Sequence, residues 1–360
     1  MICRGAPTKI LHTADIHLRE HQDERWKALQ KIIGIGKREK IDVLAISGDL
    51  FDKGIDAERL RPHVREVFSK TGFRILILPG NHDAESFESG LYYGEDVSVL
   101  DDTTPQEFGD VRIVGLPYEP VEIEEVFSRI QALRGSLKED KTNILMYHGE
   151  LLDLFFSRED IGNEGQRRYM PTKASFFEDL KIDYVLAGHF HTRFDTMKLG
   201  NNGLFIYPGS PVSITKAETG QRKANLLIVG QQPREYLLDT FHFQRIVIEF
   251  DPFVEMNPVE LVKESLRKLH PDARALYTFK GYINSRKLGM SESQFIKDLN
   301  TVVKGKCGEE PSCQVADIKK ILENDIFKSF KEKVEGGEYD EDQKRQMVQI
   351  AIQALMEALA

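Results

Sequence analysis

The chain repeats one arrangement five times: a short apolar strand that ends in a loop of polar residues. The clearest example is the run 73–78, Phe-Arg-Ile-Leu-Ile-Leu, which stops at Pro79-Gly80 and is followed by Asn81-His82-Asp83. Polar side chains at such a point project past the carboxyl edge of a sheet, where open α/β folds bind ligands. One polar loop is weak evidence for a site, and it is the recurrence that points to a function.

The first elements alternate as strand, helix, strand, helix, strand, which predicts a parallel sheet with right-handed crossovers. Strands are expected over 9–13, 41–47 and 73–78, with helices over 24–40 and 56–70 between them. The first helix has apolar residues at helical spacing, and the strand 41–47 is apolar almost throughout, as in strands covered on both faces. Further elements are a helix over 122–133 and strands over 110–115, 143–147, 182–187, 204–207, 224–229 and 245–250.

The five loops together offer seven oxygen or imidazole ligands: Asp15, His17, Asp49, Asn81, His148, His189 and His191. If the strands are parallel, all five loops lie along one edge of one sheet. Asp, Asn and His without Cys suit Mn²⁺, Fe²⁺ or Zn²⁺ better than Mg²⁺ or Ca²⁺. Seven ligands are too many for one ion, whereas two ions that share a carboxylate can use them all. Two such ions about 3.5–4 Å apart clamp a phosphoryl group and activate water for in-line attack.

Composition narrows the class of protein. The chain has 360 residues, 41% hydrophobic and 30% charged, which predicts a soluble globular protein of two or three domains. A net charge of −9 argues against a uniformly basic nucleic-acid coat but leaves room for a local basic groove. Cys3, Cys307 and Cys313 form no CxxC pair, so we expect a reduced, cytoplasmic chain. There is no signal-peptide pattern and no apolar run of the roughly 20 residues that span a membrane.

The loops also match a known family. Asp-x-His at 15–17, Gly-Asp-x-x-Asp at 48–52, Gly-Asn-His-Asp at 80–83, a lone His148 and Gly-His-x-His at 188–191 resemble, in this order, the calcineurin-like metallophosphoesterase superfamily. Within it, the runs 10–18, 47–52, 207–210 and 218–223 resemble SbcD-type DNA repair exonucleases, the nuclease subunit of the double-strand-break repair complex. The resemblance covers residues 9 to about 210 and implies an α/β fold, a β-sandwich flanked by helices.

The resemblance assigns the ligands to two ions. Asp15, His17, Asp49 and His191 would hold one ion, and Asp49 would bridge to the other. That second ion would be held by Asn81, His148 and His189. The family is usually activated by manganese, with Fe²⁺ and Zn²⁺ as alternatives.

His82 is expected to act on the substrate rather than on a metal. It would donate to the phosphate in the transition state or protonate the leaving 3′ oxygen, which suits an imidazole near neutral pH. Asp52 would orient His82; this pairing is our hypothesis, because archaeal and eukaryotic relatives often have a histidine there. Asp83 either supports the site from behind or caps its loop, and His12 is expected to pack in a strand.

The resemblance also predicts the domain order. Residues 1–244 would form the nuclease domain, 245–322 a small α+β capping domain with helices at 258–269 and 292–303 and strands at 275–283 and 313–321, and 323–360 a helical C-terminal region. In the family this region binds the coiled-coil base of an SMC-like ATPase. The resemblance also implies that this protein forms a homodimer. The apolar stripe at Met347, Ile350, Ala351, Leu355 and Leu359 either packs on its own domain or meets a partner helix.

These expectations predict a manganese-dependent DNA exo/endonuclease. A small-molecule phosphodiesterase or phosphatase is the alternative, because the metals contact only the phosphate. A third interpretation is a subunit that binds DNA ends and tethers an ATPase, with weak catalysis. The stretch 158–173 holds cations and aromatics that either form a solvated loop or neutralise phosphates and stack on bases. Its cations are Arg158, Arg167, Arg168 and Lys173, and its neighbouring aromatics are Phe155, Phe156 and Tyr169.

Overall fold

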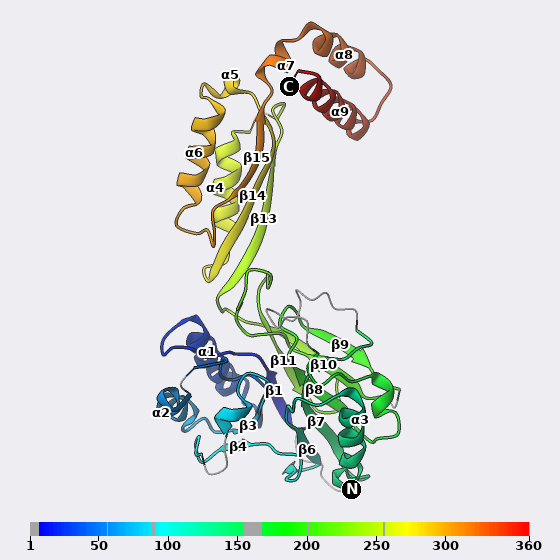
Figure 1. The fold of residues 1–360 in the computed structure, drawn as a ribbon. Helices are drawn as coiled ribbons and strands as arrows, with labels where there is room; N and C mark the ends of the chain where they lie inside the picture. Colours follow the sequence, from blue (N-terminus) through cyan, green and yellow to red (C-terminus); the bar gives the residue numbers. More distant parts are fainter. Residues whose placement is uncertain are drawn as a thin grey trace. The chain divides into compact units, whose positions relative to one another are not determined.

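The computed structural model describes residues 7–55, 57–87, 91–154, 168–200, 202–254 and 256–359. The chain divides into two compact units, Met1–Phe243 and Gln244–Ala360 (Figure 1). The predicted division into three domains stays a prediction.

The first unit contains two six-stranded sheets that face each other. One has the order β12-β11-β1-β2-β3-β4 and the other β5-β6-β7-β8-β10-β9. The strands of the first are β1 (Lys9–Thr13), β2 (Val43–Ser47), β3 (Arg74–Leu78), β4 (Val97–Val99), β11 (Lys223–Ile228) and β12 (Arg234–Leu237). Those of the second are β5 (Gln106–Phe108), β6 (Val111–Leu116), β7 (Thr142–His148), β8 (Tyr184–Gly188), β9 (Asp195–Lys198) and β10 (Leu204–Tyr207).

A single apolar layer joins the sheets. Ile10, Val43 and Leu76 from the first sheet belong to one buried cluster with Ile144 and Leu186 from the second. Burial of such side chains is the main favourable contribution to folding. The β-sandwich implied by the family resemblance is confirmed.

The expectation that all five polar loops lie on one sheet is wrong. β1, β2 and β3 are parallel neighbours in the first sheet, whereas β7 and β8 are parallel neighbours in the second. The reason is that a strand buried on both faces has the same apolar pattern whether a helix or another sheet covers it. The pattern therefore predicts the strands but does not assign them to a sheet.

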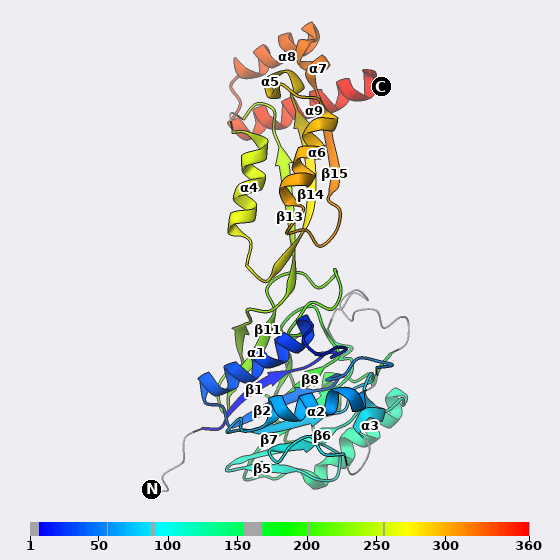
Figure 2. The same cartoon turned by 90° about the vertical axis from the view of Figure 1, so that its left-hand side faces the viewer.

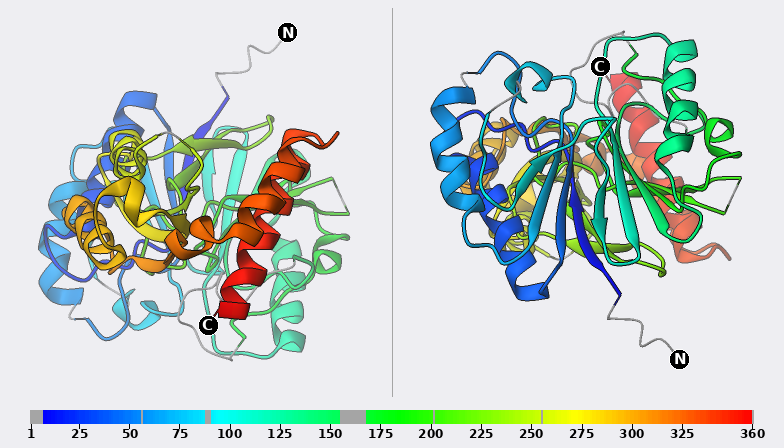
Figure 3. Two further views of the ribbon diagram at one scale, coloured as in Figure 1. Left: turned by 90° about the horizontal axis from the view of Figure 1, so that it is seen from above. Right: turned by 90° about the horizontal axis from the view of Figure 1, so that it is seen from below.

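Helices cover the outer faces of the sandwich. In the views of Figures 2 and 3, α1 (Glu24–Glu39) and α2 (Ala57–Phe68) lie against one sheet and α3 (Ile123–Ala132) lies against the other. The side chain of Asp23 accepts a hydrogen bond from the Trp26 backbone N–H at 2.8 Å and caps α1. The loop that joins β1 to this cap carries part of the site described below. Short 3₁₀ helices span Ala84–Phe87, Leu133–Ser136 and Ala174–Phe177.

The second unit is built on a three-stranded sheet of order β13-β14-β15. Its strands are β13 (His242–Phe250), β14 (Ala273–Ile283) and β15 (Ser312–Asp317). α4 (Pro258–Lys268) and α6 (Glu292–Val303) cover one face of the sheet (Figure 2), and a short helix, α5, spans Ser285–Leu288.

The predicted strand over 313–321 is too long. The strand ends at Asp317, and a helix, α7 (Lys319–Glu323), follows. The Asp317 carboxylate accepts hydrogen bonds from the backbone N–H groups of Lys319, at 3.0 Å, and Ser285, at 3.1 Å. Such local side-chain bonds favour a turn into a helix over continued sheet pairing.

Two helices form the C-terminal region, α8 (Asp325–Glu335) and α9 (Glu341–Leu359), on either side of Gly336-Gly337 as predicted. Val348 and Ile352 of α9 are buried in a cluster with Phe327 and Val334 of α8. Ile350, a member of the predicted apolar stripe, is 67% exposed. Met347, Ala351 and Leu355 of the predicted stripe are partly buried against the same cluster, so most of the stripe packs within the second unit.

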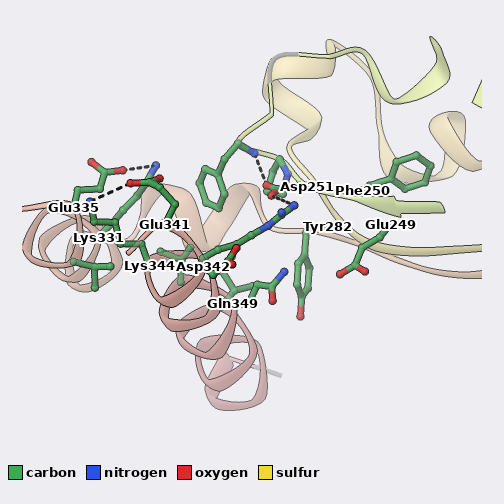
Figure 4. A pocket seen from close by; sticks show the side chains of 16 residues that line it. Glu249, Phe250, Asp251, Tyr282, Lys331, Glu335, Glu341, Asp342, Lys344 and Gln349 are labelled. Atoms are coloured by element: carbon green, nitrogen blue, oxygen red, sulfur yellow. Dashed lines mark hydrogen bonds and ion pairs between the residues drawn. The ribbon is translucent and has the colours of Figure 1, made fainter. Parts of the chain in front are cut away.

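A cleft lies where α8 and α9 meet the ends of β13 and β14 (Figure 4). Lys331 Nζ lies 4.1 Å from the centre of the Phe253 ring, and an Arg345 guanidinium nitrogen lies 3.0 Å from Asp251 Oδ2. These contacts tie both helices to the segment that follows β13.

Among the described residues, none of the helices has the length and apolar composition of a membrane span. Cys307 and Cys313 are free thiols. The cytoplasmic location stays a prediction.

Candidate metal centre

The structure brings all seven predicted ligands together. Asp15 and His17 follow β1, Asp49 follows β2, Asn81 follows β3, His148 ends β7, and His189 and His191 follow β8. Six of the seven side chains are almost completely buried, and Asn81 is partly exposed. The site is thus formed by loops from both sheets at one end of the sandwich.

The first group of ligands surrounds His17. Its Nε2 atom lies 3.3 Å from Nε2 of His191 and 3.6 Å from Oδ2 of Asp49. Asp15 Oδ1 lies 3.8 Å from His191 Nε2. The structure therefore groups the four residues that the resemblance assigns to one ion.

The second group surrounds Asn81. Its Oδ1 atom lies 2.8 Å from His148 Nε2 and 3.2 Å from His189 Nδ1. Asp49 Oδ2 lies 3.5 Å from His148 Nε2 and is thus close to a histidine of each group. This is the position that a bridging carboxylate needs.

Three of the histidines are held from outside through Nδ1. This atom lies 2.9 Å from the Ser47 carbonyl oxygen in His148 and 3.3 Å from Asp52 Oδ1 in His17. In His191 it lies 3.4 Å from Glu218 Oε1. A proton on Nδ1 leaves the Nε2 lone pair directed inward, the arrangement that orients histidine ligands in metal sites.

Four ligands have backbone torsions that side-chain-bearing residues rarely adopt. The φ angles are 55° at Asp15, 51° at His17, 53° at Asp49 and 95° at His189. Such residues persist only where surrounding contacts hold them, and they cluster at functional sites. Here the Asp15 N–H donates to the Gly48 carbonyl at 3.1 Å and the His17 N–H to the Asp49 carbonyl at 2.9 Å.

Gly48 has to be a glycine for two reasons. Its φ is +93°, and a Cβ atom there would overlap the His148 ring. Likewise, a Cβ at Gly80 would overlap the Asp49 carboxylate. The glycines therefore allow the ligands to approach one another.

The donor set fits divalent cations. Nε2 of His17 and Nε2 of His191 point at each other, and a cation between two such lone pairs relieves their repulsion. Asp49 Oδ2 is buried and has no hydrogen-bond partner among the described residues, so it has lone pairs to offer. Burial lowers the pKa of His148, but the Asp49 carboxylate outweighs it and the pKa rises to about 9. The site thus attracts positive charge.

His82 and Asp52 form a pair beside the ligands. His82 Nδ1 lies 3.1 Å from Asp52 Oδ1, and the His82 backbone N–H donates to Asp49 Oδ1 at 2.9 Å. Both residues line a cleft of about 460 Å³ that also includes His17 and His191. His82 offers a ring nitrogen within 4.8 Å of ligand atoms of His17 and Asp49, so its predicted role as a proton donor rather than a ligand stays a prediction.

Asp83 holds the loops together. It is fully buried, and its two oxygens accept hydrogen bonds from the backbone N–H groups of Gly80 at 2.8 Å and Phe51 at 3.1 Å. Of the two alternatives, support of the site from behind or a cap of the loop, these contacts favour the loop cap. Burial and the nearby Asp49 charge raise the pKa of Asp83 to about 7. His12 is packed inside the sandwich as expected, where burial lowers its pKa to about 3.

Glu218 is a site residue for which the sequence predicts no role of its own. It is buried, accepts hydrogen bonds from the Ile214 N–H at 2.8 Å and the Ser210 hydroxyl at 3.1 Å, and faces His191. Burial raises its pKa, but contacts with His191 and the buried Arg222 outweigh this and bring it to about 2. Its motif is part of the family resemblance, yet no periodicity or spacing marks a buried glutamate in a turn.

Of the basic stretch 158–173, the structure describes residues 168–173. Arg158, Arg167, Phe155 and Phe156 lie outside the described residues. Arg168 forms an ion pair with Glu150 at 2.7 Å, and Tyr169 lines the cleft.

Comparison with known proteins agrees with this geometry. A family model described as calcineurin-like phosphoesterase matches residues 8–193. The SbcD subunit of the nuclease SbcCD from Staphylococcus saprophyticus is 24% identical over 286 residues, covering 71% of each chain. An uncharacterized metallophosphoesterase of Bacillus subtilis, YhaO, is 23% identical over 290 residues, covering 72% of this chain and 67% of that protein.

Two further matches have lower identity to this chain. The DNA double-strand break repair protein Mre11 of Saccharolobus solfataricus is 22% identical over 224 residues, covering 56% of this chain and 54% of that protein. Among solved structures, TT1561 of Thermus thermophilus matches with a TM-score of 0.45 and 17% identity, covering 64% of this chain and 99% of that one.

The family match spans residues 8–193 of 360, more than half of the chain, and contains all seven ligands. This protein therefore belongs to the calcineurin-like phosphoesterase family, whose members hydrolyse phosphoesters at a two-metal site.

Proposed function

We propose that this protein is a manganese-dependent DNA exo/endonuclease that acts in double-strand-break repair. The observation that carries the proposal is the His82–Asp52 pair, 3.1 Å apart, at the wall of a cleft that the metal ligands also line. Further support comes from the names of two relatives, one part of a nuclease and the other a double-strand break repair protein.

In this proposal, one group of residues binds the metal ions and another transfers a proton. Asp15, His17, Asp49, Asn81, His148, His189 and His191 would hold two divalent ions, which activate water and stabilise charge on the phosphoryl group. Protonated on both ring nitrogens, His82 would donate its Nδ1–H to Asp52, 3.1 Å away, and keep an Nε2 proton for the leaving 3′ oxygen, which makes departure of that oxygen easier.

A labelled duplex tests the proposal. With Mn²⁺ present, we expect release of labelled products from a DNA duplex and slower release with Mg²⁺, because nitrogen ligands suit Mn²⁺ better. Bis(p-nitrophenyl) phosphate, a small phosphodiester, is assayed in parallel. Hydrolysis of this compound without any DNA cleavage would contradict the nuclease and support the small-molecule phosphodiesterase instead.

We further propose that α8 and α9 bind the SMC-like coiled-coil ATPase. The support is the family resemblance together with the exposed Ile350 on α9 and Ile326 on α8, which are 67% and 73% exposed. Ile350→Asp should weaken co-purification with the ATPase and leave DNA cleavage unchanged, and Gln349→Asp, on the same helix, serves as the control. Equal loss with both variants would point to helix damage rather than to a binding surface.

The proposed homodimer has less support. Helix α2, on the outer face of the first sheet, exposes Glu58, Arg59, Arg65 and Glu66, so it presents charge rather than an apolar face. Sedimentation of the protein at several concentrations tests this directly.

A further inference from the structure

Asp52 has more positive partners than the orientation of one histidine requires. Its Oδ1 atom faces His82 and His17. Its Oδ2 atom accepts from Arg25 Nη1 at 2.8 Å and lies 3.1 Å from Arg19 Nε. Two guanidinium groups therefore share one carboxylate oxygen at the wall of the cleft.

The two arginines are held very differently. The Arg25 side chain is 14% exposed, lies in the first turn of α1 and also donates to the His17 carbonyl at 2.6 Å. The Arg19 side chain is 58% exposed, lies on the loop between β1 and α1, and has Asp52 as its ion-pair partner within the part of the chain that the structure describes. Exposed ion pairs contribute little to stability, so Arg19 can leave Asp52 at low cost while Arg25 stays.

Arg19 also faces the right space. It lines the same cleft as His82 and the metal ligands His17 and His191. A guanidinium group binds a phosphate through two parallel hydrogen bonds, which makes arginine well suited to an anion at this point. The phosphate that is cleaved would lie at the metal ligands, so a cation beyond Asp52 is available for a different phosphate.

We propose that Arg19 binds the phosphate next to the scissile one and so selects a polynucleotide over a small phosphodiester, while Arg25 positions Asp52. This inference rests on the proposed nuclease function. A nucleic-acid strand carries a second phosphate beside each scissile one, whereas bis(p-nitrophenyl) phosphate has none. Arg19 therefore acts on substrate affinity and Arg25 on the orientation of the proton donor.

The test uses the full-length protein with Mn²⁺ and oligonucleotides that differ in one charge. One oligonucleotide has ordinary linkages, a second has a neutral methylphosphonate on the 5′ side of the scissile phosphate, and a third has it on the 3′ side. For the wild type, one of the neutral linkages should raise KM about tenfold, the loss expected for one charged hydrogen-bonding contact. Arg19→Ala should have this raised KM on the ordinary oligonucleotide and should be insensitive to the neutral linkage.

Two further variants separate affinity from positioning. Arg25→Ala should lower kcat on the oligonucleotide and lower it less on bis(p-nitrophenyl) phosphate, whose p-nitrophenolate leaves without a proton from His82. Arg19→Ala should raise KM on the oligonucleotide and leave kcat on that substrate close to the wild-type value. Arg193→Ala is the matched control, because Arg193 is also 58% exposed and paired with an aspartate but does not line the cleft.

The outcomes are distinct. If Arg19→Ala stays as sensitive to the neutral linkage as the wild type, or if Arg193→Ala raises KM equally, Arg19 does not bind that phosphate. If Arg19→Ala lowers kcat on the oligonucleotide as Arg25→Ala does, it is a second positioning residue and the inference is wrong. If the wild type hydrolyses bis(p-nitrophenyl) phosphate but no oligonucleotide, the proposed nuclease function fails and the inference fails with it.

Discussion

At the scale of single residues, Glu218 shows how a buried carboxylate supports the site through a histidine. It faces Nδ1 of His191 and is held by N–H and hydroxyl donors of its own turn. The folded chain holds its pKa at about 2, below the ordinary value of 4.5 for a glutamate. A depressed pKa means that the charged carboxylate stabilises the fold above pH 4.5 and that this contribution is lost as the pH falls toward 2.

Glu218→Gln should therefore destabilise the protein in a pH-dependent way. At pH 7 in EDTA we expect the free energy of unfolding to fall by on the order of 3 kcal/mol, from the difference between the two pKa values. The gap between variant and wild type should narrow below pH 4.5, where the wild-type carboxylate begins to lose its advantage. Urea titrations across this range measure it, and a gap that stays constant would show that charge is not the cause.

For His82, the position in the structure permits two roles, proton donor or metal ligand, and a substitution can distinguish them. His82→Asn should lower kcat for DNA cleavage about 10²-fold or more, the usual contribution of a general acid. The variant should still bind two Mn²⁺ ions per chain in equilibrium dialysis. Loss of one ion would make His82 a ligand, which its closeness to His17 and Asp49 permits. Asp52→Asn, which keeps the shape of the partner, should reduce kcat less.

The polar residues of the site were predictable to the extent that each follows a strand. His148 is the last residue of its strand, the other six predicted ligands, His82 and Asp52 lie in such loops, and the structure groups them. Arg19, Arg25 and Glu218 are not singled out by the sequence as site residues, because each lies in a loop, cap or turn where charged residues are common. Their partners come from distant parts of the chain, and only the folded structure brings them together.

At the scale of elements, the start of α1 links a helix cap to the site. Asp23 caps the helix through the Trp26 N–H, and Arg25, two residues later, contacts Asp52 and the His17 carbonyl. Fraying of this turn would release the arginine that holds Asp52. If Asp52 orients His82 as proposed, helix stability and catalysis are coupled at this point.

Asp23→Ala should cost about 1 kcal/mol of stability, as is typical for loss of an N-cap. If Arg25 positions Asp52, the same variant should also lower kcat while leaving Mn²⁺ binding intact. Asn257→Ala is the matched control, because Asn257 caps α4 in the second unit through the Val259 N–H at 2.9 Å. It should cost a similar amount of stability without a change in kcat; an equal loss of kcat in both variants would mean that the effect is general.

Elements were predicted best where burial gives a pattern. The helices α1, α3, α4 and α6 lie close to their predicted ranges, because each alternates a buried and an exposed face. β4, β5, β9 and β12 were not predicted. Each has only three or four residues and lies at the edge of its sheet. So short a run contains at most two periods of strand alternation, and tertiary pairing rather than sequence decides its structure.

At the scale of the whole molecule, each unit has apolar cores of its own. Those of the first unit include the layer between the sheets, and those of the second include the cluster around Phe279 and Phe295. The seven proposed metal ligands all belong to the first unit. An ion that binds only the folded form stabilises it by mass action, by about 2.7 kcal/mol per site at a hundredfold excess over Kd.

Metal removal should therefore affect one unfolding transition and not the other. In calorimetry of the full chain we expect two transitions, because each unit has its own core. Mn²⁺ should raise the Tm of one, EDTA should reverse this, and the second transition should stay in place as the internal control. Asp49→Asn should abolish the shift, because Asp49 lies between both groups of ligands. A single transition that shifts with Mn²⁺ would mean that the units unfold together, and a persistent shift in Asp49→Asn would place the bound ions elsewhere.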